Sequence, residues 1–180
     1  MRKLRLYIAQ SLDGFIATKT GSVDWLSDPE NPDIDLNAYG YLDFCNTIDT
    51  TIMGYNTYRE ILNFGIPFPY PDKKNYIFSR NHTKNDQNPV EFIAENPVNF
   101  TANLKKQAGK DIWLIGGGEI NKLLLNAGLI DEIILSIKPI FLGEGIKIFA
   151  DTIQLKRFKI NTVNVFDKSI IQFEMIEKKQ

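Results

Sequence analysis

Three consecutive glycines stand between a short apolar run and a stretch with helical spacing, at residues 111–120. The run at 112–115 predicts a strand buried on both faces. The glycines at 116–118 allow a sharp turn and leave no Cβ between the backbone and a bound group. Because the next helix starts with free N–H groups and a positive dipole end, this junction suits a phosphate. Two interpretations stay open: a nucleotide-binding turn, or a plain tight turn from strand to helix.

A second junction of the same kind follows the β-branched run at 50–53. Gly54 ends that run, and a short helix begins close behind it, at 56–62. Thr57 offers a hydroxyl and an N–H in the first turn of this helix. The alternative is that Thr57 only caps the helix.

A hydroxyl and a guanidinium follow the strand predicted at 75–78. Ser79 and Arg80 together suit a phosphate monoester, because hydrogen bonds to charged groups are the strong ones. The alternative for this pair is a solvated loop. His82 is the only histidine, and we expect it to be a loop residue rather than a catalyst.

The elements that must position these groups follow from periodicity and from glycine and proline breaks. Together they predict one α/β domain over residues 1–180: a mainly parallel central sheet flanked by helices, with a C-terminal antiparallel hairpin. The flagged residues would then share one edge of the sheet, where ligands of such folds bind. Strands are expected at 3–10, 50–53, 75–78, 90–93, 112–115 and 131–137, helices at 35–46, 56–62, 98–109 and 119–127, and the hairpin at 155–165 and 169–177.

Composition excludes several classes of function. With 21 basic and 22 acidic residues and a net charge of −1, the chain has no general attraction to nucleic acid or to an anionic membrane. No apolar run reaches the roughly 20 residues that span a bilayer. Cys45 is the only cysteine, so no internal disulfide can form; we expect a packed thiol and a cytoplasmic protein. One cysteine and one histidine cannot make a zinc site, and the sequence lacks Walker, Rossmann and nucleophile-elbow motifs.

Seven segments, in order along the chain, resemble those of a known superfamily. It is that of dihydrofolate reductase and of the reductase domain of bacterial riboflavin biosynthesis. Each segment is weak alone, but the ordered set is specific. The segments are residues 8–17, Gly21 with 24–25, 51–58, 74–80, 112–120, 133–136 and 139–145.

The resemblance implies an NADPH-dependent reductase with a dihydrofolate reductase-like fold. Ala9 and Ile16 would line the nicotinamide, and Ser79 and Arg80 would bind the 2′-phosphate that distinguishes NADPH from NADH. Two turns would meet the rest of the cofactor. The residues implied for the pyrophosphate and the nicotinamide ribose are Gly54, Tyr55, Asn56, Thr57, Ile115, Gly116, Gly117, Gly118, Glu119 and Ile120.

The substrate side is implied less sharply. The loops at 11–14 and 139–145 look more like riboflavin-type reductases than dihydrofolate reductases. Trp25 could cover a ligand or pack at an edge. Asp35 is the nearest candidate for the acid that folate enzymes use, although its spacing back from Gly54 does not match cleanly. The residues that we expect to contact substrate are Gln10, Asp13, Trp25, Tyr39 and Ser136.

The favoured function is therefore hydride transfer to a riboflavin-precursor substrate, as in a 5-amino-6-(5-phosphoribosylamino)uracil reductase. A first alternative is a dihydrofolate reductase with Asp35 as the acid. A second is a nucleotide-binding module without catalysis. The expected partners are NADPH and a small pyrimidine or pterin, and riboflavin-type relatives suggest a homodimer.

Overall fold

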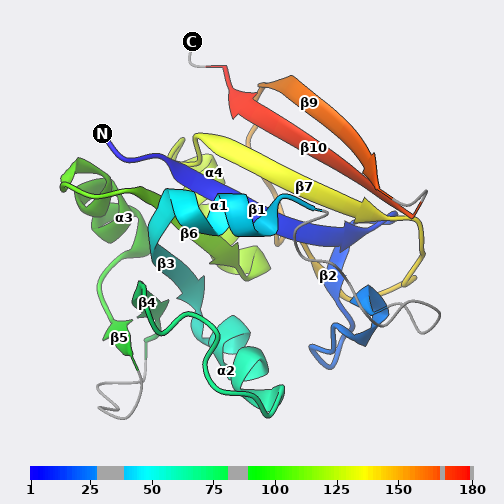
Figure 1. Cartoon of the computed structure of the whole chain (residues 1–180), viewed down its shortest axis with the longest axis horizontal. Coiled ribbons are helices and arrows are strands. Elements are labelled where there is room, and N and C mark those ends of the chain that lie inside the picture. Colours follow the sequence, from blue (N-terminus) through cyan, green and yellow to red (C-terminus); the bar gives the residue numbers. More distant parts are fainter. Residues whose placement is uncertain (28–38, 81–88, 167–168, 179–180) are drawn as a thin grey trace.

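The computed structural model describes residues 1–27, 39–80, 89–166 and 169–178. Its centre is a twisted eight-stranded sheet with the strand order β5-β4-β3-β6-β1-β7-β10-β9 (Figure 1). Six neighbouring strands are parallel, and β10 and β9 continue the sheet in antiparallel pairing. The strands are β1 (Leu4–Ser11), β3 (Ile48–Gly54), β4 (Lys74–Phe78), β5 (Val90–Ile93), β6 (Asp111–Gly116), β7 (Glu132–Lys138), β9 (Phe158–Phe166) and β10 (Ile170–Glu177).

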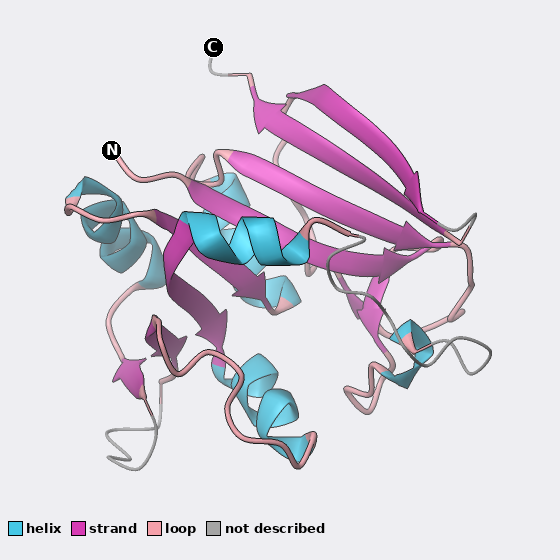
Figure 2. Cartoon of the chain, in the orientation of Figure 1, coloured by secondary structure: helices cyan, strands magenta, loops and turns pink. Residues whose placement is uncertain are grey.

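Helices lie on both faces of this sheet (Figure 2). On one face, α3 (Pro97–Lys106) and α4 (Gly118–Asn126) pack Leu104 and Leu124 against Leu4 and Leu6 of β1. On the other face, α1 (Tyr41–Thr47) covers Trp113, and α2 (Tyr55–Asn63) covers the strands β3 and β4. The predicted α/β architecture with its C-terminal hairpin is confirmed. This arrangement is stable because the helices bury their apolar faces against both sides of the sheet.

Two helix boundaries differ from the prediction. The part of the predicted helix 35–46 that the structure describes begins at Tyr41, after Gly40 at φ +67°. The helix predicted at 98–109 starts at Pro97 and ends at Lys106, since Gln107 is already extended. The Asn96 side chain caps its start by accepting hydrogen bonds from the N–H groups of Val98 and Asn99, which is typical of an N-cap asparagine.

A second, two-stranded sheet was not predicted. It joins β2 (Phe15–Ala17) to β8 (Ile146–Lys147) in antiparallel pairing. Strands of three and two residues are too short to show a sequence period. The short 3₁₀ helix η1 (Asp24–Leu26) follows β2. These pieces lie beyond the carboxyl ends of β1 and β7 and form one rim of the site described below.

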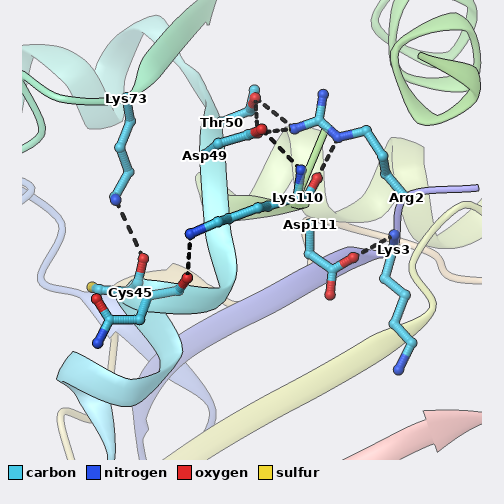
Figure 3. A network of polar contacts seen from close by, with 9 residues as sticks. Arg2, Lys3, Cys45, Asp49, Thr50, Lys73, Lys110 and Asp111 are labelled. Atoms are coloured by element: carbon cyan, nitrogen blue, oxygen red, sulfur yellow. Dashed lines mark hydrogen bonds and ion pairs between the residues drawn. The ribbon is translucent and has the colours of Figure 1, made fainter. Parts of the chain in front are cut away.

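A polar network ties together the opposite, amino-terminal ends of the strands (Figure 3). Arg2 is only 6% exposed. Its guanidinium donates to the Asp49 carboxylate, to the Lys110 carbonyl and, at 2.6 Å, to the Thr50 hydroxyl. The Lys110 N–H also donates to Asp49, at 2.9 Å. A buried guanidinium needs such partners, so this network locks the amino end of the sheet far from the cavity.

None of the helices in the described ranges has the length and apolar character needed to cross a bilayer. The same ranges hold no group of three or more side chains arranged to bind a metal ion.

Candidate active site

A cavity of about 1290 Å³ opens at the carboxyl ends of β1, β3, β4 and β6. It is also lined by the first turns of α2 and α4 and by the small β2–β8 sheet. The strand ends meet here because the strands are parallel neighbours. Every residue predicted to hold the cofactor lies on its wall except Gly116, which is buried just behind Gly117.

The starts of two helices meet on the wall of this cavity. The N-cap residues are Gly54 for α2 and Gly117 for α4, and no side chain caps either helix. The α3 helix, which lies elsewhere, does have its asparagine cap. The first N–H groups of an uncapped helix are free to bind an anion, and the helix dipole favours negative charge there. The paired helix starts therefore suit a pyrophosphate.

At two positions, neighbouring atoms come so close to the backbone that only glycine fits. Gly117 adopts φ +98°, and a Cβ atom on it would stand 3.0 Å from the Thr57 hydroxyl oxygen. A Cβ on Gly118 would collide with the carbonyl oxygen of Lys147 in β8. Neither position accepts a side chain without a shift of its neighbours. The glycines thus let α2, α4 and β8 converge on one small volume.

One end of the cavity carries positive charge. Ser79 and Arg80 lie on its wall at the end of β4, as predicted. Arg59 of α2 and, on the β2–β8 side, Lys147 of β8 also line the cavity, and sequence reasoning missed both. Arg59 pairs with Glu60 at 3.4 Å, whereas no ion pair joins Lys147 to another residue of the described ranges. Arg59 lies close behind Thr57 on the helix already flagged, so helical spacing could have found it; no such signal existed for Lys147.

The inner wall, formed mainly by β1, β6 and Tyr70, is uncharged and partly aromatic. Tyr7, Ala9, Tyr70 and Ile115 line it, with Ile16 from β2. Burial raises the pKa of Tyr7. Burial also raises the pKa of Tyr70, to about 12. Both phenols therefore remain protonated at neutral pH and offer neutral hydrogen-bonding groups beside apolar surface. Such a wall suits a flat heterocycle better than a charged group.

Asp13 ties two loops together, and its expected contact with substrate stays a prediction. Its carboxylate accepts hydrogen bonds from the Ser11 hydroxyl at 2.6 Å and from the N–H groups of Leu142 and Gly143 at 3.1 and 2.7 Å. These hydrogen bonds lower the pKa of Asp13 below its ordinary value, and the bond from Ser11 has the largest effect. The carboxylate thus fixes the 139–145 loop to the end of β1, outside the cavity lining.

The other residues predicted for the substrate side also lie off the cavity wall. The hydroxyl of Ser136 accepts a hydrogen bond from Gln172, and the Tyr39 carbonyl accepts one from Tyr7. Trp25 lies in η1, between lining residues rather than among them, and Gln10 follows Ala9 on β1. Their role in substrate binding stays a prediction. Asp35, the predicted acid, lies outside the described residues.

The fold and the cavity define a dihydrofolate reductase-like α/β domain. Residues 71–172 match the family model of the RibD C-terminal domain. The uncharacterised protein YwjB of Bacillus subtilis (strain 168) is 37% identical over 169 residues, which cover 94% of this chain and 95% of YwjB. The chain therefore belongs to the RibD C-terminal domain family.

Solved structures agree with this assignment. A Shewanella sp. PV-4 protein assigned to riboflavin biosynthesis is 28% identical, with a TM-score of 0.84 and coverage of 98% of this chain and 99% of that one. A Thermotoga maritima deaminase/5-amino-6-(5-phosphoribosylamino)uracil reductase shares the fold at 16% identity and TM-score 0.72; the match covers 98% of this chain and 57% of that protein.

Enterococcus faecalis dihydrofolate reductase, complexed with NADP(H) and RAB-propyl, also shares the fold. Its identity is 16% and its TM-score 0.70, with 98% of this chain and 97% of that chain covered. The family match and these neighbours support a reductase-like role for the domain.

Proposed function

We propose that this protein is an NADPH-dependent reductase that transfers hydride to a riboflavin-precursor substrate of the ribosylamino-pyrimidine type. One observation carries the proposal: a single cavity joins two uncapped helix starts, an arginine at one end and an uncharged aromatic wall at the other. That sequence of environments matches a dinucleotide phosphate chain that leads to a nicotinamide and then to a heterocycle.

The residues present fit NADPH, which would supply the hydride when bound. In this proposal the turns that begin α2 and α4 hold the pyrophosphate with their backbone N–H groups, and Thr57 adds its hydroxyl. Arg80 and Ser79 hold the 2′-phosphate. Ala9, Ile16 and Ile115 provide an apolar seat for the nicotinamide, which excludes water from the reacting face. The NADP(H) complex of the Enterococcus reductase, which has this fold, supports the choice of cofactor.

The substrate class is supported by the family and by the inner wall. The RibD C-terminal domain family and the Thermotoga reductase point to a ribosylamino-pyrimidine. Tyr7 and Tyr70 provide neutral hydroxyl groups and ring faces, which suit an aminopyrimidine base. The carboxylates among the described lining residues are Glu60, Glu95 and Glu119, and they come from the α2, α3 and α4 side of the cavity rather than from the Tyr7 wall.

Folate reduction is the main alternative, with Asp35 as the acid. If this were the activity, Asp35→Asn should abolish turnover of dihydrofolate, and turnover that survives the substitution removes that role. The second alternative, a nucleotide-binding module, predicts tight NADPH binding with no acceptor reduced in a broad screen.

The test is an assay of the purified protein with NADPH and 5-amino-6-(5-phosphoribosylamino)uracil. The proposal predicts oxidation of NADPH that depends on the pyrimidine, together with formation of the ribitylamino product by mass spectrometry. Parallel reactions with dihydrofolate, and with NADH in place of NADPH, are the controls. Tight NADPH binding without pyrimidine-dependent oxidation would contradict the substrate assignment while leaving the cofactor assignment intact.

A further inference from the structure

A buried amide connects the C-terminal hairpin to the inner wall of the cavity. Gln172 is 3% exposed and is the one residue of β10 that is fully buried. It lies opposite Ser136 of β7, which is itself opposite Ala9 of β1. The Gln172 Nε2 atom donates to the Ser136 hydroxyl at 3.1 Å and to the Tyr7 hydroxyl at 3.4 Å. A glutamine in the middle of a sheet thus reaches a residue that lines the cavity.

These contacts fix the direction of the Tyr7 hydroxyl. Its single proton is donated to the backbone carbonyl of Tyr39, at 3.1 Å. The phenol oxygen already accepts from Gln172, and it retains weaker acceptor capacity for one more donor. Both N–H groups of the Gln172 amide are used, one on Ser136 and one on Tyr7. Because the Tyr7 proton is committed to Tyr39, any further hydrogen bond to the Tyr7 oxygen must come from a donor.

The ring of Tyr7 is held equally firmly. It packs edge-on against Phe44, with ring centroids 4.7 Å apart, and lies 6.4 Å from Trp113. Burial of an amide such as Gln172 costs free energy unless its hydrogen bonds are satisfied, and an apolar residue would pack at this place without that cost. The buried amide is explained if it acts on Tyr7.

We propose that the Tyr7 hydroxyl accepts a hydrogen bond from a ring N–H group of the substrate base, and that Gln172 is a positioning residue that holds this hydroxyl in its acceptor orientation. The proposal rests on the proposed function and names a feature of its substrate: a flat heterocycle with an N–H donor at the edge that meets Tyr7. Ser136 contributes only through Gln172, which accounts for its place behind the cavity wall.

The first test measures binding of two pyrimidine probes to the NADPH complex by isothermal titration calorimetry. The probes are 5,6-diaminouracil, which has ring N–H donors, and its 1,3-dimethyl derivative, which lacks them. Tyr7→Phe removes only the hydroxyl. It should weaken 5,6-diaminouracil about three- to tenfold, the range of one neutral hydrogen bond, while the dimethyl probe and NADPH keep their affinities.

The second test asks whether Gln172 acts through Tyr7. Gln172→Leu should weaken 5,6-diaminouracil by a similar factor in the wild-type background and should have no further effect in the Tyr7→Phe background. Asn164→Leu is the matched control, because Asn164 lies directly across from Gln172 on β9 and contributes nothing to the cavity lining. Fluorine NMR of protein labelled with 3-fluorotyrosine adds a readout of geometry: the Tyr7 resonance should move in Gln172→Leu and not in Asn164→Leu.

The inference is overturned if Tyr7→Phe leaves the affinity for 5,6-diaminouracil unchanged, if it weakens both probes equally, or if the two substitutions act additively. Failure of the proposed function has a different signature. The wild-type NADPH complex would then bind neither pyrimidine probe, and both proposals would fall together.

Discussion

The hydroxyl oxygen of Thr57 lies 3.0 Å from the point where a Cβ atom on Gly117 would stand. Thr57 belongs to the first turn of α2, and Gly117 immediately precedes α4. Two helices that follow different strands therefore begin against each other, and a residue larger than glycine would separate them. The proposed pyrophosphate site depends on this contact, because each helix alone offers only its own free N–H groups.

Gly117→Ala should damage cofactor binding and stability together. The new methyl group would crowd Thr57, and φ +98° is strained for any residue other than glycine. We expect a loss of about 1–3 kcal/mol in the free energy of unfolding and at least about a tenfold loss of NADPH affinity. Urea denaturation and calorimetric titration measure the two effects.

Gly143→Ala is the matched control for that substitution. Gly143 has φ +74°, and the space around an added Cβ atom is open. The alanine variant therefore has backbone strain but does not crowd the cavity. Its NADPH affinity should equal that of the wild type. An equal loss of affinity in both variants would show that strain alone, rather than the contact with Thr57, weakens binding.

Lys147→Ala should weaken NADPH and NADH by the same factor. The side chain of Lys147 is a cation on the cavity wall, and its backbone carbonyl faces Gly118 at the start of α4. A charge there would act on the pyrophosphate, which both cofactors carry. We expect a loss of about three- to tenfold for one partly solvated charged contact. Lys159→Ala, on β9, is the control, and selective loss of NADPH alone would place Lys147 at the 2′-phosphate instead.

Asp49→Asn should destabilise the fold in a pH-dependent way. Burial acts to raise the pKa of Asp49, but hydrogen bonds from Thr50 and the Lys110 amide, together with the Arg2 charge, outweigh it and hold the pKa below its ordinary value. A depressed pKa in the folded state adds stability at pH values above the unfolded pKa, and this stability is lost as the pH falls through the folded pKa.

At neutral pH we therefore expect Asp49→Asn to lose about 1 kcal/mol of unfolding free energy, because buried Arg2 loses its charged partner while the 38% exposure of the Asp49 side chain lets solvent screen the pair. The difference from the wild type should shrink below about pH 4. Urea denaturation across pH measures it. Asp72→Asn, which removes an exposed carboxylate beside Lys73, should change stability little; a pH-independent loss in Asp49→Asn would contradict the argument.

The sheet could be predicted from sequence because its strands carry strong local signals. The apolar run of β6 and the alternation of Leu4 and Leu6 in β1 each specify a strand without reference to the rest of the chain. The start of α1 was placed too early, since helical spacing continued through Gly40 while its backbone did not. The two-residue strand β8 could not be recognised, because its pairing with β2 is decided by tertiary contacts.

The residues of the site also fall into two groups: those with a local sequence signal and those placed by tertiary contacts. The glycine turns and the Ser79-Arg80 pair could be predicted from the sequence, because the strand ends of a parallel sheet share one edge. The place of Lys147 in the site could not be predicted, since only the pairing of β8 with β2 brings it to the cavity. Asp13 was flagged correctly as a polar group at a strand end, yet its partners, Leu142 and Gly143, are supplied by a loop about 130 residues further along. Sequence position alone could not show that this carboxylate was already occupied.

The central claim is that the cavity binds NADPH with Arg80 on the 2′-phosphate. It is tested most directly by titrating NADPH and NADH into wild-type protein and Arg80→Ala. A guanidinium–phosphate contact is charge-assisted, so the account predicts that Arg80→Ala weakens NADPH more than about tenfold and leaves NADH nearly unchanged. Equal weakening of both cofactors, or wild-type protein that binds neither, would contradict it.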